Sequence, residues 1–191
     1  MIKKSLIVLA LEAESQGKIE KLDAPIDILY TGVGKVNAAI ALGQALRHQN
    51  YQQIINVGSA GSHLFEPLQV VCCHRFLQHD MNAQVFGYAP FQTPQEKNIA
   101  LTVKVPKSLQ HLPQTTLYTG DQFISDPNLG YPVIDMEGYA LAKTTQKYEI
   151  PFICLKFISD NANQKASYTW EESLMIGSEL LTNILNEFLK N

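Results

Sequence analysis

Acidic residues directly follow two apolar segments of this sequence, and they are the side chains best suited to chemistry. Asp135 and Glu137 come after the apolar pair Val133-Ile134, and Asp160 comes after the apolar segment 151–158. Open α/β sheets bind their ligands outside the carboxyl ends of the strands. If both segments are buried strands, these carboxylates form a polar site at one edge of a sheet. Carboxylates placed in this way can serve as general acid and general base.

A structural role is the alternative for Asp135 and Asp160. Aspartate is common at the N-cap of a helix, where its carboxylate accepts a hydrogen bond from a backbone N–H. Residues 139–148, which follow Asp135, have the spacing of a helix. The two aspartates end successive strands, however, and this arrangement favours a shared site over two separate caps.

Two earlier strands also end in polar groups. Glu14 follows the apolar run Ser5–Leu11, and Ser59 lies in the loop 58–62 after the predicted strand Gln53–Val57. A loop of such small residues leaves backbone N–H groups and a hydroxyl available for an anion or a ribose. The same residue types are also common turn formers, so this segment alone does not decide between a site and a turn.

The hydrophobic pattern predicts an α/β protein with one domain over residues 1–191. Continuous apolar runs are typical of strands that are covered on both faces, and apolar residues at helical spacing predict helices. The predicted strands are Ser5–Leu11, Ala24–Tyr30, Gln53–Val57, Leu68–Phe76, Ala100–Val105, Thr116–Thr119, the segment beginning at Val133, and Pro151–Ile158. The predicted helices are Val36–His48, Tyr139–Tyr148 and Trp170–Leu189.

Two short motifs resemble nucleotide or metal sites but lack essential parts. Gly32-Val33-Gly34 precedes a predicted helix, yet it has neither the third glycine of a dinucleotide fingerprint nor a Walker GK[ST]. His79-Asp80 has no third ligand at a suitable spacing. We therefore predict a hydrogen-bonded structural histidine, no metal site and no cofactor.

Composition excludes several classes of protein. The chain is 46% hydrophobic and 17% charged, with a net charge of −3, which argues against a general nucleic-acid or membrane-surface binder. No apolar run approaches the roughly 20 residues of a membrane span. Glu12 and Glu14 stand where a signal peptide would be cleaved, so the N-terminal run predicts a core strand. The three cysteines have no disulfide or metal spacing, and we expect reduced thiols in a cytoplasmic protein.

Seven segments resemble, in order, the nucleoside phosphorylase/nucleosidase superfamily, and are most similar to its 5′-methylthioadenosine/S-adenosylhomocysteine nucleosidases. The segments are ALEAE (Ala10–Glu14), TGVGKVNAA (Thr31–Ala39), INVGSAGS (Ile55–Ser62), HDMNAQVFGY (His79–Tyr88), TGDQFIS (Thr119–Ser125), IDMEGYALA (Ile134–Ala142) and KFISDNAN (Lys156–Asn163). The resemblance implies a phosphorylase-like fold with a mixed sheet flanked by helices. It also implies cleavage of the N-glycosidic bond of a purine nucleoside.

The resemblance assigns roles to individual residues at the reacting bond. Glu14 corresponds to the acid that activates the attacking water, with Ser59 near the ribose and that water. Asp160, positioned by Ser159, corresponds to the group that helps protonate N7 of the leaving purine. Glu137 corresponds to the carboxylate that holds the ribose hydroxyls.

Further residues would surround the substrate in the same way. The resemblance implies that Met136 packs under the sugar, Phe123 stacks on the base and the Ile124 backbone contacts the base edge. Trp170 stands where the family has an aromatic lid residue. Phe86 and Tyr88, with Pro94, resemble residues that a partner subunit inserts beside the 5′ substituent, which implies a homodimer.

Hydrolysis is favoured over phosphorolysis because phosphate pockets use arginine forks. The sequence has only two arginines, Arg47 in a predicted helix and Arg75 in a predicted strand. Lys156 stands where the nucleosidases usually carry arginine, and Asp135 where they usually carry glutamate.

The chain is also shorter than a typical nucleosidase, with residues missing after Glu14, between Ala100 and Thr116, and between Ser125 and Pro132. These departures leave the 5′ group open among methylthioadenosine, S-adenosylhomocysteine, 5′-deoxyadenosine and a futalosine-like nucleoside. A futalosine hydrolase, a compact purine nucleoside phosphorylase and a non-catalytic nucleoside-binding protein are the alternatives.

Overall fold

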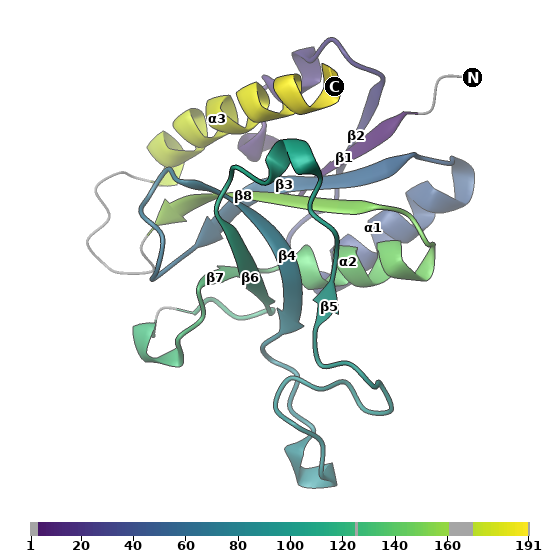
Figure 1. The fold of residues 1–191 in the computed structure, drawn as a ribbon, viewed down its shortest axis with the longest axis vertical. Coiled ribbons are helices and arrows are strands. Elements are labelled where there is room, and N and C mark those ends of the chain that lie inside the picture. Colours follow the sequence, from purple (N-terminus) through teal and green to yellow (C-terminus); the bar gives the residue numbers. More distant parts are fainter. Residues whose placement is uncertain (1–3, 125, 161–169, 191) are drawn as a thin grey trace.

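The computed structural model describes residues 4–124, 126–160 and 170–190, and for Pro127, Asp160 and Trp170 the description covers the backbone alone. These residues form one mixed sheet with helices on both faces (Figure 1). The strands are β1 Ser5–Leu9, β2 Ile26–Tyr30, β3 Gln53–Gly61, β4 Val70–Gln78, β5 Leu101–Thr102, β6 Gln114–Thr119, β7 Val133–Asp135 and β8 Phe152–Asp160. The helices are α1 Lys35–His48, α2 Gly138–Lys147 and α3 Trp170–Lys190. The predicted α/β class and mixed sheet are confirmed.

The sheet closes on itself at its centre. Its strand order is β2-β1-β3-β7-β6-β4-β5, and β8 pairs with both β3 and β4. Two routes therefore connect β3 to β4, one through β8 and one through β7 and β6. β1 and β8 run parallel to β3, whereas β7 meets β3 antiparallel at the single pair Gly61↔Ile134.

The expectation of a site at a common edge of neighbouring strands is wrong in one respect. β7 and β8 are not paired with each other, because both pair with β3, which lies between them. β3 is also longer than predicted, since Gly58, Ser59 and Ala60 continue the parallel ladder with β8 instead of forming a loop. The closure of the sheet brings the strand ends together.

The core has two layers, one on each face of the sheet (Figure 1). Side chains alternate between the faces of a strand. In β8, Leu155 and Phe157 pack in the cluster beneath α3, while Cys154 and Ile158 pack in the cluster beneath α1 and α2. All four are fully buried, and burial of a large apolar side chain stabilises the fold by about 1.5–3 kcal/mol. In the described part of the chain, no helix has the length and apolar character that crossing a bilayer requires.

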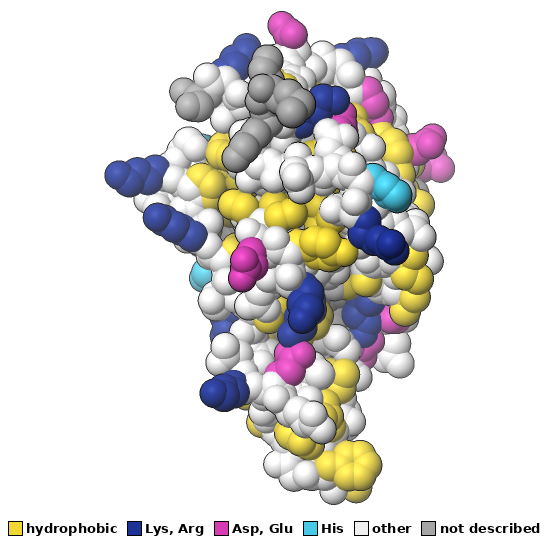
Figure 2. All heavy atoms as spheres, turned by 90° about the vertical axis from the view of Figure 1, so that its right-hand side faces the viewer, with side chains coloured by type: hydrophobic (Ala, Val, Ile, Leu, Met, Phe, Trp, Pro, Cys, Tyr) yellow, Lys and Arg dark blue, Asp and Glu magenta, His cyan; other side chains and the backbone are white. Residues whose placement is uncertain are grey.

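An extended segment between β4 and β5 projects from this body. Residues 79–100, which we call the arm, carry one short 3₁₀ turn at Gln84–Phe86. The arm extends away from the sheet at the bottom of Figure 1, and Figure 2 shows hydrophobic side chains at its tip. Val85 and Phe86 are 86% and 79% exposed, so this apolar tip has no partner within the described chain.

Close packing of α3 on β8 gives a stability prediction. A Cβ added at Gly177 would come within 3.0 Å of the buried Phe157 ring, closer than real Cβ atoms approach. We expect Gly177→Ala to lower the free energy of unfolding by about 1–2 kcal/mol, because overpacking outweighs the better helix propensity of alanine. Urea-induced unfolding measures the change.

Gly43 in α1 provides the matched control. A Cβ at Gly43 meets nothing within 4 Å, so Gly43→Ala should raise the free energy of unfolding by up to about 1 kcal/mol. Equal stabilisation by both alanines would show that α3 does not pack on β8 as closely as described.

Candidate active site

A cavity of about 230 Å³ lies where β1, β3, β7 and β8 end. It brings together residues that are far apart in the sequence. The predicted site residues that line it are Glu14, Ser59, Phe123, Ile124, Met136, Glu137 and Ser159. None of the described residues that line it is lysine or arginine.

Glu14 is held by hydrogen bonds on both of its carboxylate oxygens. It lies in the 3₁₀ turn Glu12–Glu14 after β1 and is only 4% exposed. Oε2 accepts from the backbone N–H groups of Ala10 and Leu11 at 3.0 and 3.2 Å. Oε1 accepts from the backbone N–H of Ser59 at 2.8 Å and from its Oγ at 2.9 Å. Of these four donors, only the Ser59 hydroxyl can rotate away and leave a lone pair for another donor.

Glu137 follows β7 and faces the same cavity. Its Oε1 accepts a hydrogen bond of 2.8 Å from the backbone N–H of Gly34, just before α1. Gly34 has φ +97°, a conformation that glycine adopts without strain. The N-terminus of α1, which carries a partial positive charge, therefore faces the Glu137 carboxylate. The anion that this glycine-containing turn binds is thus a side chain of the same protein.

The pKa of Glu137 is raised to about 7. Burial is the largest cause, and the nearby charges of Asp135 and Glu14 add to it. Lys156 and the Gly34 N–H act in the opposite direction without cancelling the rise. Glu137 can therefore change its protonation state near neutral pH.

Asp135 is a buried structural carboxylate as well as a neighbour of the cavity. Its Oδ1 accepts from Thr119 Oγ1 at 2.6 Å, and its Oδ2 accepts from the Gly138 N–H at 2.8 Å. Gly138 is the first residue of α2, whose N-cap is Glu137, so Asp135 binds the first N–H of the helix without being its N-cap residue. Asp135 also lines the cavity, as expected of a residue near the site.

Lys156 supplies a buried positive charge beside these acids. Its Nζ lies 3.0 Å from Asp135 Oδ2, and the two side chains are 3% and 1% exposed. Burial alone would lower the pKa of Lys156, but Asp135, together with Glu137 and Glu14, raises it above its ordinary value. Lys156 therefore remains charged and compensates the carboxylates behind the cavity wall.

The cavity lining also contains apolar side chains. Phe123 and Ile124 follow β6, and Phe123 is 79% exposed at the cavity mouth. Met136 is half-buried between the two acids Asp135 and Glu137. Ser159 is buried near the end of β8, and its Oγ donates to the Ala60 carbonyl at 3.3 Å.

Some predicted site residues are not placed at this cavity. Phe86 and Tyr88 lie on the arm and do not line it. Asp160 ends β8, where its backbone pairs with Gly61, but its side chain and that of Trp170 lie outside the described part of the structure. The roles assigned to these four residues remain predictions, as do the roles assigned to the residues that line the cavity.

The sequence interpretation missed a network of charges next to the cavity. Lys35, Asp80 and Asp121 contact one another through ion pairs and hydrogen bonds. The available signal was that each lies inside one of the seven segments that resemble the family. The expectation of a hydrogen-bonded His79 fails at Nε2, which has no partner among the described residues; its ring stacks on Tyr131 at 5.5 Å.

The geometry suits a reaction that needs two carboxylates on one small molecule. The carboxylate of Glu14 is held in place, and only its hydrogen bond from the Ser59 hydroxyl can be replaced by one from a bound molecule. Glu137, by contrast, has a pKa of about 7 and changes its protonation state near neutral pH. Among the described residues, no group of three or more His, Cys, Asp or Glu side chains could hold a metal ion.

Comparison with known proteins identifies the family. The sequence model of the phosphorylase superfamily matches residues 15–190. A 5′-methylthioadenosine/S-adenosylhomocysteine nucleosidase from Tolumonas auensis is 31% identical over 189 residues, which cover 86% of this chain and 81% of the relative. The corresponding Psychromonas ingrahamii protein is 29% identical over 182 residues, covering 84% and 79% of the two chains.

Solved structures of low sequence identity share the fold. The Neisseria meningitidis 5′-methylthioadenosine/S-adenosylhomocysteine nucleosidase, in complex with methylthio-immucillin-A, has a TM-score of 0.85 at 23% identity and covers 99% of each chain. The futalosine hydrolase of Helicobacter pylori has a TM-score of 0.84 at 21% identity, covering 98% of this chain and 99% of that one. The family match over nearly the whole sequence and the shared fold agree, and the chain belongs to the phosphorylase superfamily.

Proposed function

We propose that this protein is a purine nucleosidase that hydrolyses the N-glycosidic bond of a 5′-modified adenosine, releasing the free base and the ribose derivative. The observation that carries the proposal is the placement of Glu14 and Glu137 in one cavity beside Phe123 and Ile124. The relatives named as 5′-methylthioadenosine/S-adenosylhomocysteine nucleosidases support the same substrate class.

In the proposed reaction, water attacks C1′ of the ribose. The Ser59 hydroxyl rotates away from Glu14, whose freed lone pair accepts one proton of that water. The water oxygen bonds to C1′ as the bond from C1′ to purine N9 breaks. The electron pair of the broken bond leaves with the purine, which takes a proton at N7. Asp160, directly after Ser159 on β8, would supply that proton.

The proposed reaction also requires stabilisation of the positive charge that develops on the ribose. C1′ becomes positively charged in an oxocarbenium-like transition state, and nearby carboxylates stabilise that charge. Glu137, held from behind by Gly34, would accept hydrogen bonds from the ribose hydroxyls in its ionised form. Met136, between the two acids in sequence, would pack under the sugar.

Water is the proposed nucleophile because the described lining offers no cation for phosphate. Arg47 lies in α1 and Arg75 in β4, and neither lines the cavity. Lys156 lies behind the cavity wall and is already paired with Asp135. The described part of the lining has no arginine, the residue whose planar fork matches the geometry of phosphate.

We also propose a cytoplasmic homodimer, in which the arm of one subunit reaches the cavity of the other. Exposed apolar patches mark interaction sites, and Val85 and Phe86 form one at the arm tip. Phe86 and Tyr88 would then lie beside the 5′ substituent of the partner's substrate. This arrangement explains why they do not line the cavity of their own chain.

The proposed function is tested by incubating the protein with 5′-methylthioadenosine, S-adenosylhomocysteine, 5′-deoxyadenosine and futalosine, and following the free base by chromatography. We expect base release in the absence of phosphate. Release that depends on phosphate would make the protein a phosphorylase. Release from futalosine alone would favour a futalosine hydrolase, and release from no nucleoside would favour a binding protein.

Glu14→Gln tests the proposed base. The amide keeps the size of the side chain but cannot accept a proton from water, so we expect kcat to fall by about 10²–10⁴-fold. Glu12 lies in the same 3₁₀ turn and is exposed, which makes Glu12→Gln a matched control with unchanged kcat. Steady-state kinetics of both variants provides the measurement. Equal activity of both would exclude Glu14 from the reaction.

The raised pKa of Glu137 predicts a pH dependence. Because the ionised form would hold the ribose, kcat/KM should rise with pH and level off above about 7. The Glu137→Gln variant should be less active and should lack this rise. The folded protein retains a proton that the unfolded chain loses near 4.5, so the contribution of Glu137 to stability decreases as the pH rises towards 7. If kcat/KM of Glu137→Gln rose with pH as it does in the unmodified protein, the pH dependence would come from a group other than Glu137.

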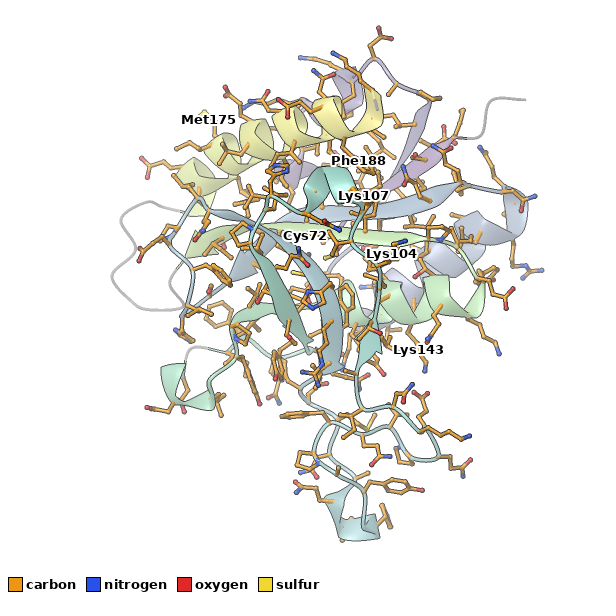
Figure 3. The ribbon with its side chains drawn as sticks, viewed as in Figure 1. Cys72, Lys104, Lys107, Lys143, Met175 and Phe188 are labelled. Carbon is orange, nitrogen blue, oxygen red and sulfur yellow. The ribbon has the colours of Figure 1, made fainter. Side chains whose placement is uncertain are left out.

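The arm predicts a dimer whose stability depends on Phe86. Sedimentation velocity should give a dimer, and Phe86→Ala should raise its dissociation constant by at least about 10-fold, as loss of a buried interface aromatic does. Met175→Ala is the control, because Met175 is 55% exposed and lies on the outer side of α3, away from the arm (Figure 3). A fully active monomer would contradict the role of the arm.

A further inference from the structure

A network of three charged side chains adjoins the cavity without lining it. Lys35 begins α1, Asp80 follows β4 at the foot of the arm, and Asp121 follows β6. We propose that Asp80 is a positioning residue that fixes the base-binding side of the cavity relative to its sugar-binding side. This inference rests on the proposed function, because it assumes that a purine packs against Phe123.

Both oxygens of Asp80 have partners on different segments. Oδ1 lies 2.5 Å from Lys35 Nζ, and Oδ2 accepts from the backbone N–H of Asp121 at 2.9 Å. Asp121 completes the ring: its Oδ1 accepts from the Lys35 backbone N–H at 2.9 Å, and its Oδ2 lies 3.7 Å from Lys35 Nζ. Asp80 therefore joins the start of α1 to the start of the 121–124 segment.

These two segments carry the two sides of the cavity. Gly34, directly before Lys35, donates its N–H to Glu137, the carboxylate proposed to hold the sugar. Asp121 lies two residues before Phe123, the side chain proposed to stack on the base. A shift of Asp121 away from α1 would move the base without moving the sugar. A purine that stacks on Phe123 would lose part of this contact, so such a shift weakens binding of the base in the ground state and the transition state alike.

The network is buried enough to hold its geometry. The side chains of Lys35 and Asp80 are 14% and 20% exposed, and ion pairs that are partly buried are screened less by salt than exposed ones. Burial raises the pKa of Asp80, but the hydrogen bonds from Lys35 and from the Asp121 N–H outweigh it, so the pKa is lowered overall. Asp80 is therefore ionised at neutral pH, and its charge is available to both partners.

A second ion pair, between Lys143 and Glu96 of the arm, does not join α1 to the 121–124 segment and can be compared with the Asp80 network. Lys143 Nζ and Glu96 lie 2.6 Å apart, and their side chains are 41% and 30% exposed. Lys143 lies on α2, beside the segment that leads into β5 (Figure 3). This pair joins the arm to α2 but contacts neither the Gly34 turn nor the 121–124 segment. It therefore serves as a matched control for loss of an arm carboxylate.

The experiment replaces one carboxylate oxygen in each pair. We expect Asp80→Asn to raise the dissociation constant for free adenine by about 10-fold, equivalent to 1.4 kcal/mol. KM for the nucleoside should rise by the same factor, while kcat changes by less than about 3-fold. Glu96→Gln should leave all three quantities unchanged. Calorimetric titration with adenine, steady-state kinetics and thermal unfolding are measured on each variant.

A double-mutant cycle separates positioning from a general loss of structure. Lys35→Met and Asp80→Asn should each weaken adenine binding, and the double variant should be no weaker than the worse single variant, because both remove the same contact. Additive losses would overturn the network. The positioning role would also be overturned if Asp80→Asn bound adenine as tightly as the unmodified protein. The same conclusion would follow if the only change in Asp80→Asn were a lower unfolding temperature.

The outcomes also separate this inference from the proposed function. If the unmodified protein binds adenine but releases no base from any nucleoside, the hydrolase proposal fails, and adenine affinity still decides the role of Asp80. If the unmodified protein hydrolyses a nucleoside and Asp80→Asn matches it in KM and adenine affinity, only the positioning role fails. Failure of the unmodified protein both to bind adenine and to release base from any nucleoside would overturn both.

Discussion

The constraint on which this structure depends is the gathering of three carboxylates around one small cavity. Glu14, Asp135 and Glu137 are all less than a tenth exposed and line the same space. Like charges in a poorly solvated site raise one another's pKa unless other groups compensate them. The acids have different partners: Glu14 accepts four hydrogen bonds, Asp135 pairs with the buried Lys156 cation, and Glu137 has the more distant Lys156 charge and one hydrogen bond from the Gly34 N–H.

This unequal compensation separates the roles of the acids. Asp135 is fully occupied, because it pairs with Lys156 and accepts hydrogen bonds from the Gly138 N–H at the start of α2 and from Thr119. Glu137 has the least support and the raised pKa, so it is the acid most sensitive to pH and to a bound sugar. The fold makes this possible by closing its sheet, which directs strand ends of both orientations towards one cavity.

The sequence predicted the parts of the site that depend on local pattern. Apolar runs followed by polar residues located Glu14 and Glu137 just after strands, where they lie, whereas Ser59 lies within β3 and not in a loop after it. The pattern did not predict that β3 separates β7 from β8, because pairing is decided by the closure of the whole sheet. Nor did it reveal the Asp80 network, whose contacts join segments that are more than forty residues apart in sequence. Such pairings depend on tertiary structure, and no local spacing encodes them.

The most direct test of the central claim is a crystal structure of the inactive Glu14→Gln variant with an intact nucleoside. The distances from C1′ to residue 14 and from the ribose hydroxyls to Glu137 are the quantities to measure. The account predicts that C1′ faces residue 14 with one water between them, that the ribose hydroxyls contact Glu137, and that the purine lies on Phe123. A nucleoside bound outside this cavity, or one with C1′ turned away from residue 14, would contradict it.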